Sequence, residues 1–293
     1  MRSVHYGQLG ASLYVPATHK DLTTILKEGC SNARSLIFCT EDAVAPEAVS
    51  WAVSRLAKAL RDSPAPDHYL RFVRPRNPFV LNQLLSTPGV LEAIDGLVIP
   101  KFDADSAPGW REVLARHDAG LAVMPTIETP DVFSEAGALR ILEAVKQLDN
   151  PIPCLRIGAN DLLGCIGLKR QPGQTLYDTP LRAVIERLIT LARPAGFELS
   201  APVCDLFGEP ETLSREVAQD IAWGLWAKTC IHPSQIEVVE TMFSQAISVQ
   251  QSQAIALQGR GDAVFKDNGQ MLEKSCHQEW AQRVTAIYAA CGQ

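Results

Sequence analysis

Two acidic residues, Glu128 and Asp161, stand where short apolar stretches of the sequence end. Glu128 follows the stretch 120–124, and a Thr-Pro break that starts a helix comes directly after it. Asp161 follows the stretch 153–157 and a glycine turn. In a parallel barrel the carboxyl ends of all strands meet at one face. We therefore expect the two carboxylates to meet over one divalent cation.

The chemistry of this acid pair favours Mg²⁺, with Mn²⁺ as the alternative. Magnesium keeps several waters and takes one or two carboxylates plus oxygens of the substrate. Zinc is disfavoured because the six histidines show no clustered metal-ligand spacing. Either acid alone could simply cap the helix that follows it. Two acids at the ends of successive strands favour metal binding over capping.

Two arginines, Arg74 and Arg76, follow the third apolar stretch. A planar guanidinium at such a place could clamp a substrate carboxylate with two hydrogen bonds. Side chains alternate along an extended segment, so both arginines should point to the same side unless the proline between them bends the path. We expect one arginine to bind substrate and the other to be an ion-pair partner.

Other polar residues also stand at predicted strand ends. Glu41 and Asp42 could orient metal-bound water and a neighbouring cation, or could merely form a polar rim. Lys101 follows the fourth stretch and is a candidate substrate contact. His232, in Ile-His-Pro, is more typical of a loop histidine held by hydrogen bonds than of a catalytic base.

The positions of these residues depend on a regular alternation of strands and helices. Predicted strands occupy residues 11–16, 33–39, 68–73, 96–100, 120–124, 153–157, 197–201 and 224–228. Predicted helices occupy residues 18–29, with Thr18 as the cap, and 46–60, 79–85, 110–117, 132–148, 180–192, 211–220 and 234–257, with Ser234 as the last cap. Short, nearly unbroken apolar strands between helices indicate a parallel sheet buried on both faces. Eight strands favour a closed (β/α)₈ TIM barrel over an open doubly wound sheet.

The last part of the sequence follows a different pattern. Residues 259–269 are a glycine-flanked, hairpin-like stretch, and helical periodicity resumes from 271 to 290. We therefore predict a barrel domain over residues 1–257 and a C-terminal arm or lid over residues 258–293 that packs on a neighbouring subunit.

Composition narrows the class of protein further. A net charge of -6 without runs of like charge gives no footprint for nucleic acid or an anionic membrane, so we expect a small-molecule ligand. Neither a membrane span nor a signal peptide is visible, and we expect a cytoplasmic protein. None of the eight cysteines forms a Cys-x-x-Cys pair, which favours buried free thiols in a reducing compartment. A glycine-rich dinucleotide fingerprint and a phosphate-binding P-loop are both absent from the sequence.

Seven short motifs occur in an order that resembles a known family. They are Leu-Tyr-Val-Pro-Ala at 13–17, Thr-Glu-Asp-Ala-Val at 40–44, Val-Arg-Pro-Arg-Asn at 73–77, Val-Ile-Pro-Lys at 98–101, Thr-Ile-Glu-Thr at 126–129, Gly-Ala-Asn-Asp-Leu at 158–162 and Ala-Lys-Thr-Cys-Ile-His-Pro-Ser-Gln at 227–235. Together they resemble the HpcH/HpaI aldolase and citrate lyase β-subunit superfamily, and most closely its citrate-lyase-like branch. The resemblance covers nearly the whole predicted barrel.

The resemblance implies a TIM-barrel carbon–carbon lyase. Its Mg²⁺ ligands correspond to Glu128 and Asp161, and the arginine that holds the substrate carboxylate corresponds to Arg74. In that branch a Gly-x-Met-Ile-Asp stretch of the arm closes over a neighbouring site, and Gly-Gln-Met-Leu-Glu at 269–273 is similar, which makes Glu273 the candidate acid or base. The expected substrate is a 2-oxo or hydroxy acid or its acyl thioester, such as an acyl-CoA. The expected assembly is a homo-oligomer, either a trimer or a hexamer.

Three departures from the family pattern leave the substrate open. Cys39 stands where the branch usually has the first Asp of an acidic cluster, the lid acid is Glu273 rather than Asp, and Pro75-Arg76 alters the Arg-x-Asn spacing. The acyl part could be carried by coenzyme A, by an acyl carrier protein or by neither. The altered cluster also motivates a rival hypothesis, in which the barrel is a non-catalytic binding or assembly subunit.

Overall fold

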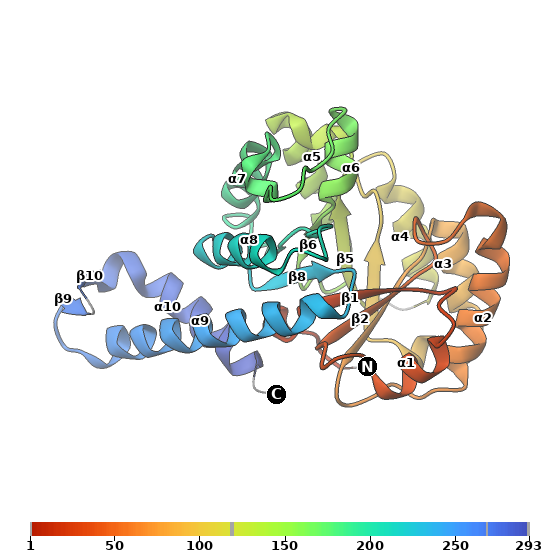
Figure 1. The fold of residues 1–293 in the computed structure, drawn as a ribbon, viewed down its shortest axis with the longest axis horizontal. Coiled ribbons are helices and arrows are strands. Elements are labelled where there is room, and N and C mark those ends of the chain that lie inside the picture. Colours follow the sequence, from red (N-terminus) through yellow and green to blue (C-terminus); the bar gives the residue numbers. More distant parts are fainter. Residues whose placement is uncertain (1, 118–119, 268, 292–293) are drawn as a thin grey trace.

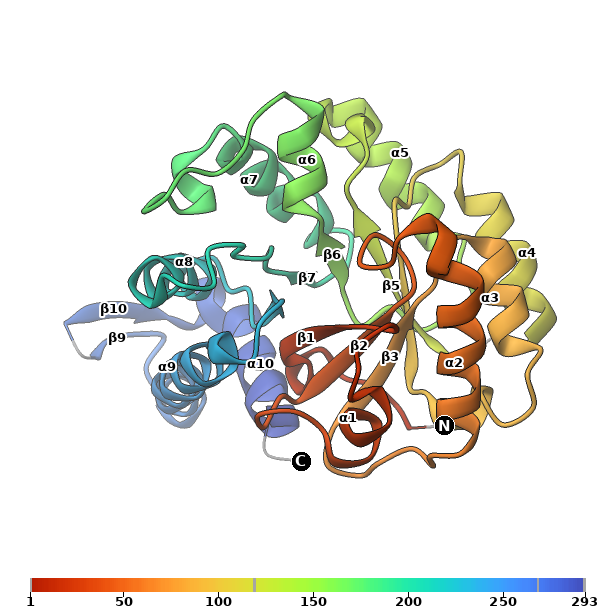
Figure 2. The same cartoon turned by 45° about the vertical axis from the view of Figure 1, so that its right-hand side comes forward.

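The computed structural model describes residues 2–117, 120–267 and 269–291, and its centre is a ring of parallel strands surrounded by helices (Figures 1 and 2). The strands of the ring are β1 Gly10–Pro16, β2 Ser35–Cys39, β3 Leu70–Arg74, β4 Gly96–Ile99, β5 Ala122–Ile127, β6 Leu155–Ile157, β7 Leu199–Ser200 and β8 Ala227–Cys230. Neighbours pair in the order β7-β6-β5-β4-β3-β2-β1-β8. The fold is the predicted (β/α)₈ TIM barrel.

Helices follow the strands, and most of them cover the outside of the ring. They are α1 Leu22–Glu28, α2 Val49–Arg61, α3 Pro78–Leu85, α4 Ala107–His117, α5 Glu135–Lys146, α6 Ala159–Cys165, α7 Leu181–Ala192, α8 Pro210–Ala222, α9 Ser234–Gly259 and α10 Lys274–Cys291. Short 3₁₀ turns are η1 Tyr6–Gln8, η2 Pro46–Ala48, η3 Leu91–Ala93, η4 Pro130–Phe133 and η5 Leu176–Asp178. None of the helices in the described ranges combines the length and the apolar character needed to cross a membrane.

The barrel is closed at a narrow seam between β7 and β8. Ala201 N donates to Ala227 O at 2.6 Å and Thr229 N donates to Ala201 O at 3.2 Å, so a single bridge beyond the two-residue β7 joins the strands. Tyr6 links the two sides of this seam, because its hydroxyl donates to Leu199 O of β7 and accepts from the N–H of Trp226, which precedes β8, both at 2.7 Å. Side-chain hydrogen bonds thus replace part of the missing strand ladder.

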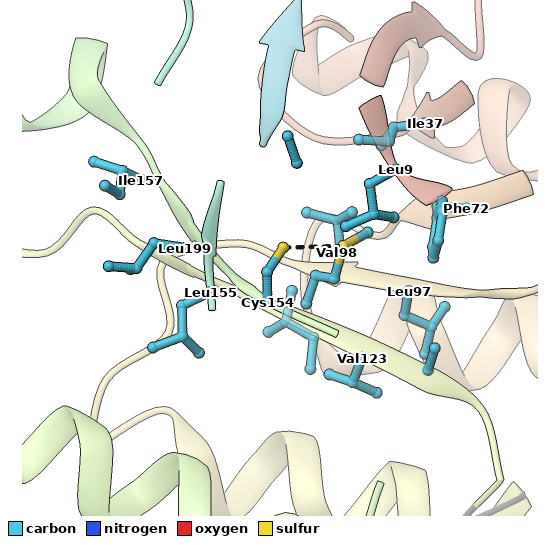
Figure 3. Packing of buried hydrophobic residues seen from close by; sticks show 14 of the residues in the cluster. Leu9, Ile37, Phe72, Leu97, Val98, Val123, Cys154, Leu155, Ile157 and Leu199 are labelled. Carbon is cyan, nitrogen blue, oxygen red and sulfur yellow. Dashed lines mark hydrogen bonds between the residues drawn. The ribbon is translucent and has the colours of Figure 1, made fainter. Parts of the chain in front are cut away.

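Apolar side chains fill the ring and the layer beneath the helices (Figure 3). Every residue of β2 and of β3 is buried, as expected for strands that are covered on both faces. Phe72 and Leu97 are fully buried at the β3–β4 pair. All eight cysteines are free, but only four of them are buried as predicted, namely Cys39, Cys154, Cys204 and Cys230, whereas Cys165 and Cys276 are exposed. Cys154 Sγ lies 3.6 Å from the Met124 sulfur, a contact drawn as the dashed line in Figure 3.

Several predicted element boundaries are wrong. Helix α1 begins at Leu22 rather than after Thr18, and Asp21 precedes it without a side-chain cap. Ser234 is the first residue of α9, not its cap, because the Pro233 backbone already has helical angles. The predicted strand 224–228 starts later, at Ala227. Helix α6 was not predicted at all.

The C-terminal arm leaves the barrel as a pair of antiparallel helices. Helix α9 has 26 residues, about 39 Å at 1.5 Å per residue, and so reaches well past the barrel. The hairpin of β9 Val264–Asp267 and β10 Gln270–Glu273 lies at the far tip, and α10 returns towards the N-terminal turn η1 (Figures 1 and 2). Met271 pairs with Lys266 in this hairpin, so the predicted helical start at 271 is wrong.

Candidate active site

Charged side chains gather at the carboxyl ends of strands β2 to β6. Glu41 and Asp42 follow β2, Arg74 ends β3, Lys101 follows β4 and Glu128 follows β5. Parallel pairing aligns these ends, since Cys39 is in register with Arg74 and Thr126 with Arg156. All of these residues except Lys101 line one cavity of about 220 Å³.

Glu128 is a buried acid of this cavity, with 4% of its surface exposed. Its Oε1 accepts from Arg74 Nη2 at 2.9 Å and from the Lys101 backbone N–H at 2.7 Å. Burial raises the pKa of Glu128 to about 7, because the negative charge of Asp161 adds to the desolvation and Arg74 only partly opposes it. A nearby cation would therefore stabilise the charged form of this carboxylate.

Glu41 is a second buried acid with the opposite behaviour. Its Oε2 accepts from Arg74 Nε and Nη2 at 3.2 and 3.0 Å, and its Oε1 accepts from Lys101 Nζ at 2.7 Å. Burial alone would raise the pKa of Glu41, but Arg74 and the Lys101 ammonium more than reverse this and hold it at about 2. Glu41 is therefore ionised at neutral pH and binds both cations, which agrees with one of the two roles that the sequence left open.

Lys101 connects the acids at the mouth of the cavity. Its Nζ lies 3.0 Å from an Asp42 carboxylate oxygen and 3.7 Å from Asp161 Oδ1. Its backbone has a positive φ of 48°, a region that non-glycine residues rarely adopt. That turn directs the backbone N–H at Glu128 and the ammonium at the other acids. Lys101 is thus an internal counter-ion here, and the cavity-lining residues do not include it.

Asp161 lies in the first turn of α6 and lines the same cavity as Glu128. Burial raises the pKa of Asp161, and the Lys101 ammonium only partly opposes the shift. Gly158 lies between the two acids in the chain, and a Cβ there would stand 2.0 Å from Glu128 Oε2. The glycine therefore makes room for the carboxylate.

These residues fit a magnesium ion. Within the described ranges no three His, Cys, Asp or Glu side chains form a complete metal-binding cluster. Mg²⁺ does not need one, because it typically takes one or two carboxylates and fills its other positions with water and substrate oxygens. Glu128 and Asp161 provide an all-oxygen donor set with raised pKa values. Glu128 Oε2 is the oxygen that the Arg74 and Lys101 bonds leave available.

The remaining predicted residues lie elsewhere. Arg76 was expected on the same side as Arg74, but it donates to Val44 O at 3.3 Å and is not among the residues that line the cavity. The strand ends at Arg74, so the alternation no longer applies beyond it. His232 is a loop residue with its Nδ1 2.8 Å from Ser234 Oγ, as expected.

Glu273 is remote from the cavity of its own chain. It ends β10 at the tip of the arm, and its Oε1 accepts from Ser275 Oγ at 2.7 Å (Figures 1 and 2). Its action in a neighbouring subunit's site stays a prediction.

Several residues that line the cavity were not assigned a role from the sequence, among them Tyr14, Arg156 and Thr229. The Arg74 and Arg156 guanidiniums lie over the Tyr14 ring, 5.9 and 5.6 Å from its centroid. Arg156 donates to Thr229 Oγ1 at 2.6 Å. The sequence did contain a signal for Arg156, which is a charged residue inside an apolar strand. Such a residue must either find a partner or line a cavity.

Comparison with known proteins places the chain in a family. Residues 3–291 match the family described as C–C bond lyase of the TIM-barrel fold. A citrate lyase subunit beta-like protein of Deinococcus radiodurans is 27% identical over 91% of this chain and 93% of that protein. A (3S)-malyl-CoA thioesterase of Cereibacter sphaeroides is 27% identical over 79% of this chain and 76% of that protein.

Solved structures agree on the fold. The crystal structure of CitE from Mycobacterium tuberculosis in complex with magnesium, acetoacetate and coenzyme A has a TM-score of 0.68 and 21% identity, over 98% of this chain and 100% of that one. With the family match over nearly the whole length, the chain belongs to the C–C bond lyases of the TIM-barrel fold, in the citrate lyase β-like branch of the HpcH/HpaI superfamily.

Proposed function

We propose that the chain is a Mg²⁺-dependent carbon–carbon lyase or aldolase that acts on a 2-oxo or hydroxy acid or on its acyl thioester. The observation that carries this proposal is the pair Glu128 and Asp161, which line one cavity from the ends of adjacent strands and both have raised pKa values. A bound cation stabilises the charged form of such a pair, so the two acids lose their protons more readily when the cation is present.

The side chains divide the work as follows. Glu128 and Asp161 hold the cation, and Arg74 fixes Glu128 while facing the cavity that receives the substrate carboxylate. Bound Mg²⁺ supplies charge stabilisation where an enolate oxygen develops. A base takes the substrate hydroxyl proton, the carbon–carbon bond breaks with its electron pair moving into the enolate, and an acid then protonates the enolate carbon. Glu41 and Asp42 keep Lys101 and Arg74 in position during these steps.

The relatives support this substrate class. The CitE structure contains magnesium together with acetoacetate and coenzyme A, and the Cereibacter protein acts on a malyl-CoA thioester. In the first case a short oxo acid is bound together with coenzyme A, and in the second a short hydroxy acid is joined to coenzyme A as a thioester. A panel of 2-oxo acids and acyl-CoA thioesters is therefore the appropriate first screen.

The decisive experiment removes one predicted ligand at a time. Glu128→Ala and Asp161→Ala should each lower kcat/KM by about 1000-fold, because the enolate charge loses its main stabilisation. Circular dichroism should show an intact fold in both variants. Glu112→Ala, an exposed acid on α4, is the matched control and should behave like the wild type. Full activity of Glu128→Ala in chelator-treated buffer would contradict the proposal.

We propose further that Glu273 acts as acid or base in the site of a neighbouring subunit of a homo-oligomer. The hairpin that carries it projects from the barrel, and Val264 and Met271 on this hairpin are 51% and 63% exposed. Mixed oligomers of Asp161→Ala and Glu273→Ala chains test the arrangement. A site shared between two chains should recover about a quarter of wild-type activity by random assembly. Two inactive parents whose mixture stays inactive would exclude sharing.

The rival hypothesis of a non-catalytic binding subunit rests on Cys39. This residue is buried in the cavity wall, and burial raises the pKa of its thiol, so it carries no charge where the branch usually has an aspartate. A binding subunit would show Mg²⁺-dependent affinity for the acids in the panel but no turnover. A lyase would show both.

A further inference from the structure

Arg156 is a buried cation in the wall of the candidate active site. It lies in the middle of β6 with 1% of its surface exposed, and it lines the same cavity as Glu128 and Asp161. Its guanidinium reaches across the barrel interior to hydroxyls of β1 and β8, at 3.4 Å from Ser12 Oγ and 2.6 Å from Thr229 Oγ1. Both partners are neutral.

Other deeply buried cations of the described chain are neutralised or fully hydrogen-bonded. Lys228 forms ion pairs with Glu216 and Asp220 at 3.0 and 2.8 Å. Arg71 donates to three backbone carbonyls, those of Leu26, Ser63 and Ala93. Each of these cations therefore has the partners that its burial demands.

Arg156 has neither the ion pairs of Lys228 nor the complete hydrogen bonding of Arg71. Within the described ranges no carboxylate lies at ion-pair distance from it, and its Nε–H, although buried, has no hydrogen-bond partner. A guanidinium carries five N–H donors, of which the two hydroxyl contacts use only a part. An unpaired charge out of water is costly, so a buried guanidinium beside a cavity is a place where an anion binds well.

Arg74 cannot take this role alone. Its guanidinium already binds Glu41 and Glu128, at 3.0 and 2.9 Å, so its positive charge is balanced by the protein. Arg156 lies within the strand, whereas Asp161 follows the end of the same strand in α6. The cavity thus has a pair of metal-binding acids at the strand ends and an unpaired cation further inside the barrel.

We propose that Arg156 is a specificity-determining residue that binds a second carboxylate of the substrate. This inference rests on the proposed function and narrows it, because the preferred substrate becomes a dicarboxylic 2-oxo or hydroxy acid unit. One end of that acid lies at Glu128 and Asp161. The other carboxylate takes the unused donors of Arg156 beside Thr229.

Binding of matched acids tests the proposal without relying on turnover. Oxaloacetate and 4-methyl-2-oxopentanoate differ by a carboxylate in place of an isopropyl group, and 2-oxoglutarate and 5-methyl-2-oxohexanoate form a second such pair. Calorimetry with Mg²⁺-saturated wild-type protein should give about 10- to 100-fold tighter binding of at least one diacid than of its partner, as expected for a charge-assisted hydrogen bond pair. Arg156→Met should abolish this preference and leave the monoacid affinity unchanged.

Two further variants separate charge from structure. Arg156→Lys keeps the charge but loses the planar fork, and should retain part of the diacid preference. Arg140→Met removes the same charge from the surface of α5, where Arg140 pairs with Asp131, and should bind as the wild type does.

Equal affinities for diacid and monoacid in the wild type would overturn the inference while leaving the proposed function standing. The same holds if Arg156→Met keeps the wild-type preference. Absence of Mg²⁺-dependent binding of every acid would refute the proposed function, and this inference with it. If Arg156→Met does not fold, the wild-type preference and the Arg156→Lys ratio still decide the matter.

Discussion

Magnesium binding should weaken as the pH falls through 7, because Glu128 then holds a proton that the metal must displace. The pKa of this buried carboxyl is about 7, well above the model-compound value of 4.5. Below pH 7 most of the metal-free protein carries the neutral acid, which is a poor ligand for Mg²⁺. Above pH 7 the carboxylate is ionised and ready to bind. The affinity must therefore rise with pH and level off above about 8.

The size of the effect follows from this single titration. About nine-tenths of the Glu128 carboxyls are protonated at pH 6 and about one-tenth at pH 8, so the apparent Mg²⁺ affinity should differ about tenfold between these two values. Binding should release about 0.9 proton at pH 6 and about 0.1 proton at pH 8. Asp161, whose pKa is also raised, acts in the same direction.

Isothermal titration calorimetry in two buffers of different ionisation enthalpy measures both the affinity and the proton release. Glu128→Gln is the control, since it cannot titrate and should bind Mg²⁺ weakly with little pH dependence. Burial also raises the pKa of Asp220, to about 6. Its titration should not contribute to the protons released by Mg²⁺ binding, because Asp220 is paired with Lys228 in a separate buried cluster. A wild-type affinity that stays constant from pH 6 to pH 8, with no proton release, would refute the reasoning.

Three further changes test other parts of the structure. Gly158→Ala should lower Mg²⁺ affinity at least tenfold at unchanged net charge, because the new Cβ displaces the Glu128 carboxylate; calorimetry measures this, and wild-type affinity would contradict it. Lys228→Met leaves the buried Asp220 carboxylate without its cation and Glu216 with Arg170 alone, and should lower the free energy of unfolding by about 3–5 kcal/mol in urea titrations; a change below about 1 kcal/mol would show that water enters the cluster. Tyr6→Phe removes both bonds at the barrel seam and should cost about 1–3 kcal/mol, with Mg²⁺ affinity preserved, and an unchanged unfolding midpoint would argue against the seam role.

Much of the site could be predicted because its residues follow the strands rather than lie within them. Apolar stretches mark the strands, parallel pairing brings their carboxyl ends together, and the residue after each end must then face the same opening. This reasoning located Glu41, Lys101, Glu128 and Asp161 from sequence alone. It does not depend on exact boundaries, which is why errors of two or three residues in the predicted elements did no harm.

Residues inside the strands were harder to predict, since their direction depends on register. Alternation shows that Arg156 points away from its two apolar neighbours, but the sequence does not say whether that direction is the barrel interior or the helix layer. Arg76 shows the converse error, in which alternation was extended past the strand end at Arg74. The role of Tyr6 at the seam requires contacts between residues more than 190 positions apart, which no local pattern reports.

The two buried glutamates of the site, Glu41 and Glu128, differ in how far cations of the protein balance their charge, and this difference indicates which of them is the better metal ligand. Glu41 has two cations of the protein beside it and a pKa of about 2, so adding a third cation gains little there. Glu128 shares Arg74 with Glu41 and has a pKa of about 7, so its negative charge is only partly balanced. A divalent ion therefore gains most at Glu128, on the side of the cavity that Asp161 shares. Lys101 Nζ lies 2.7 Å from Glu41 but 3.7 Å from Asp161, so the lysine pairs more closely with Glu41, as expected if Asp161 also binds the proposed metal.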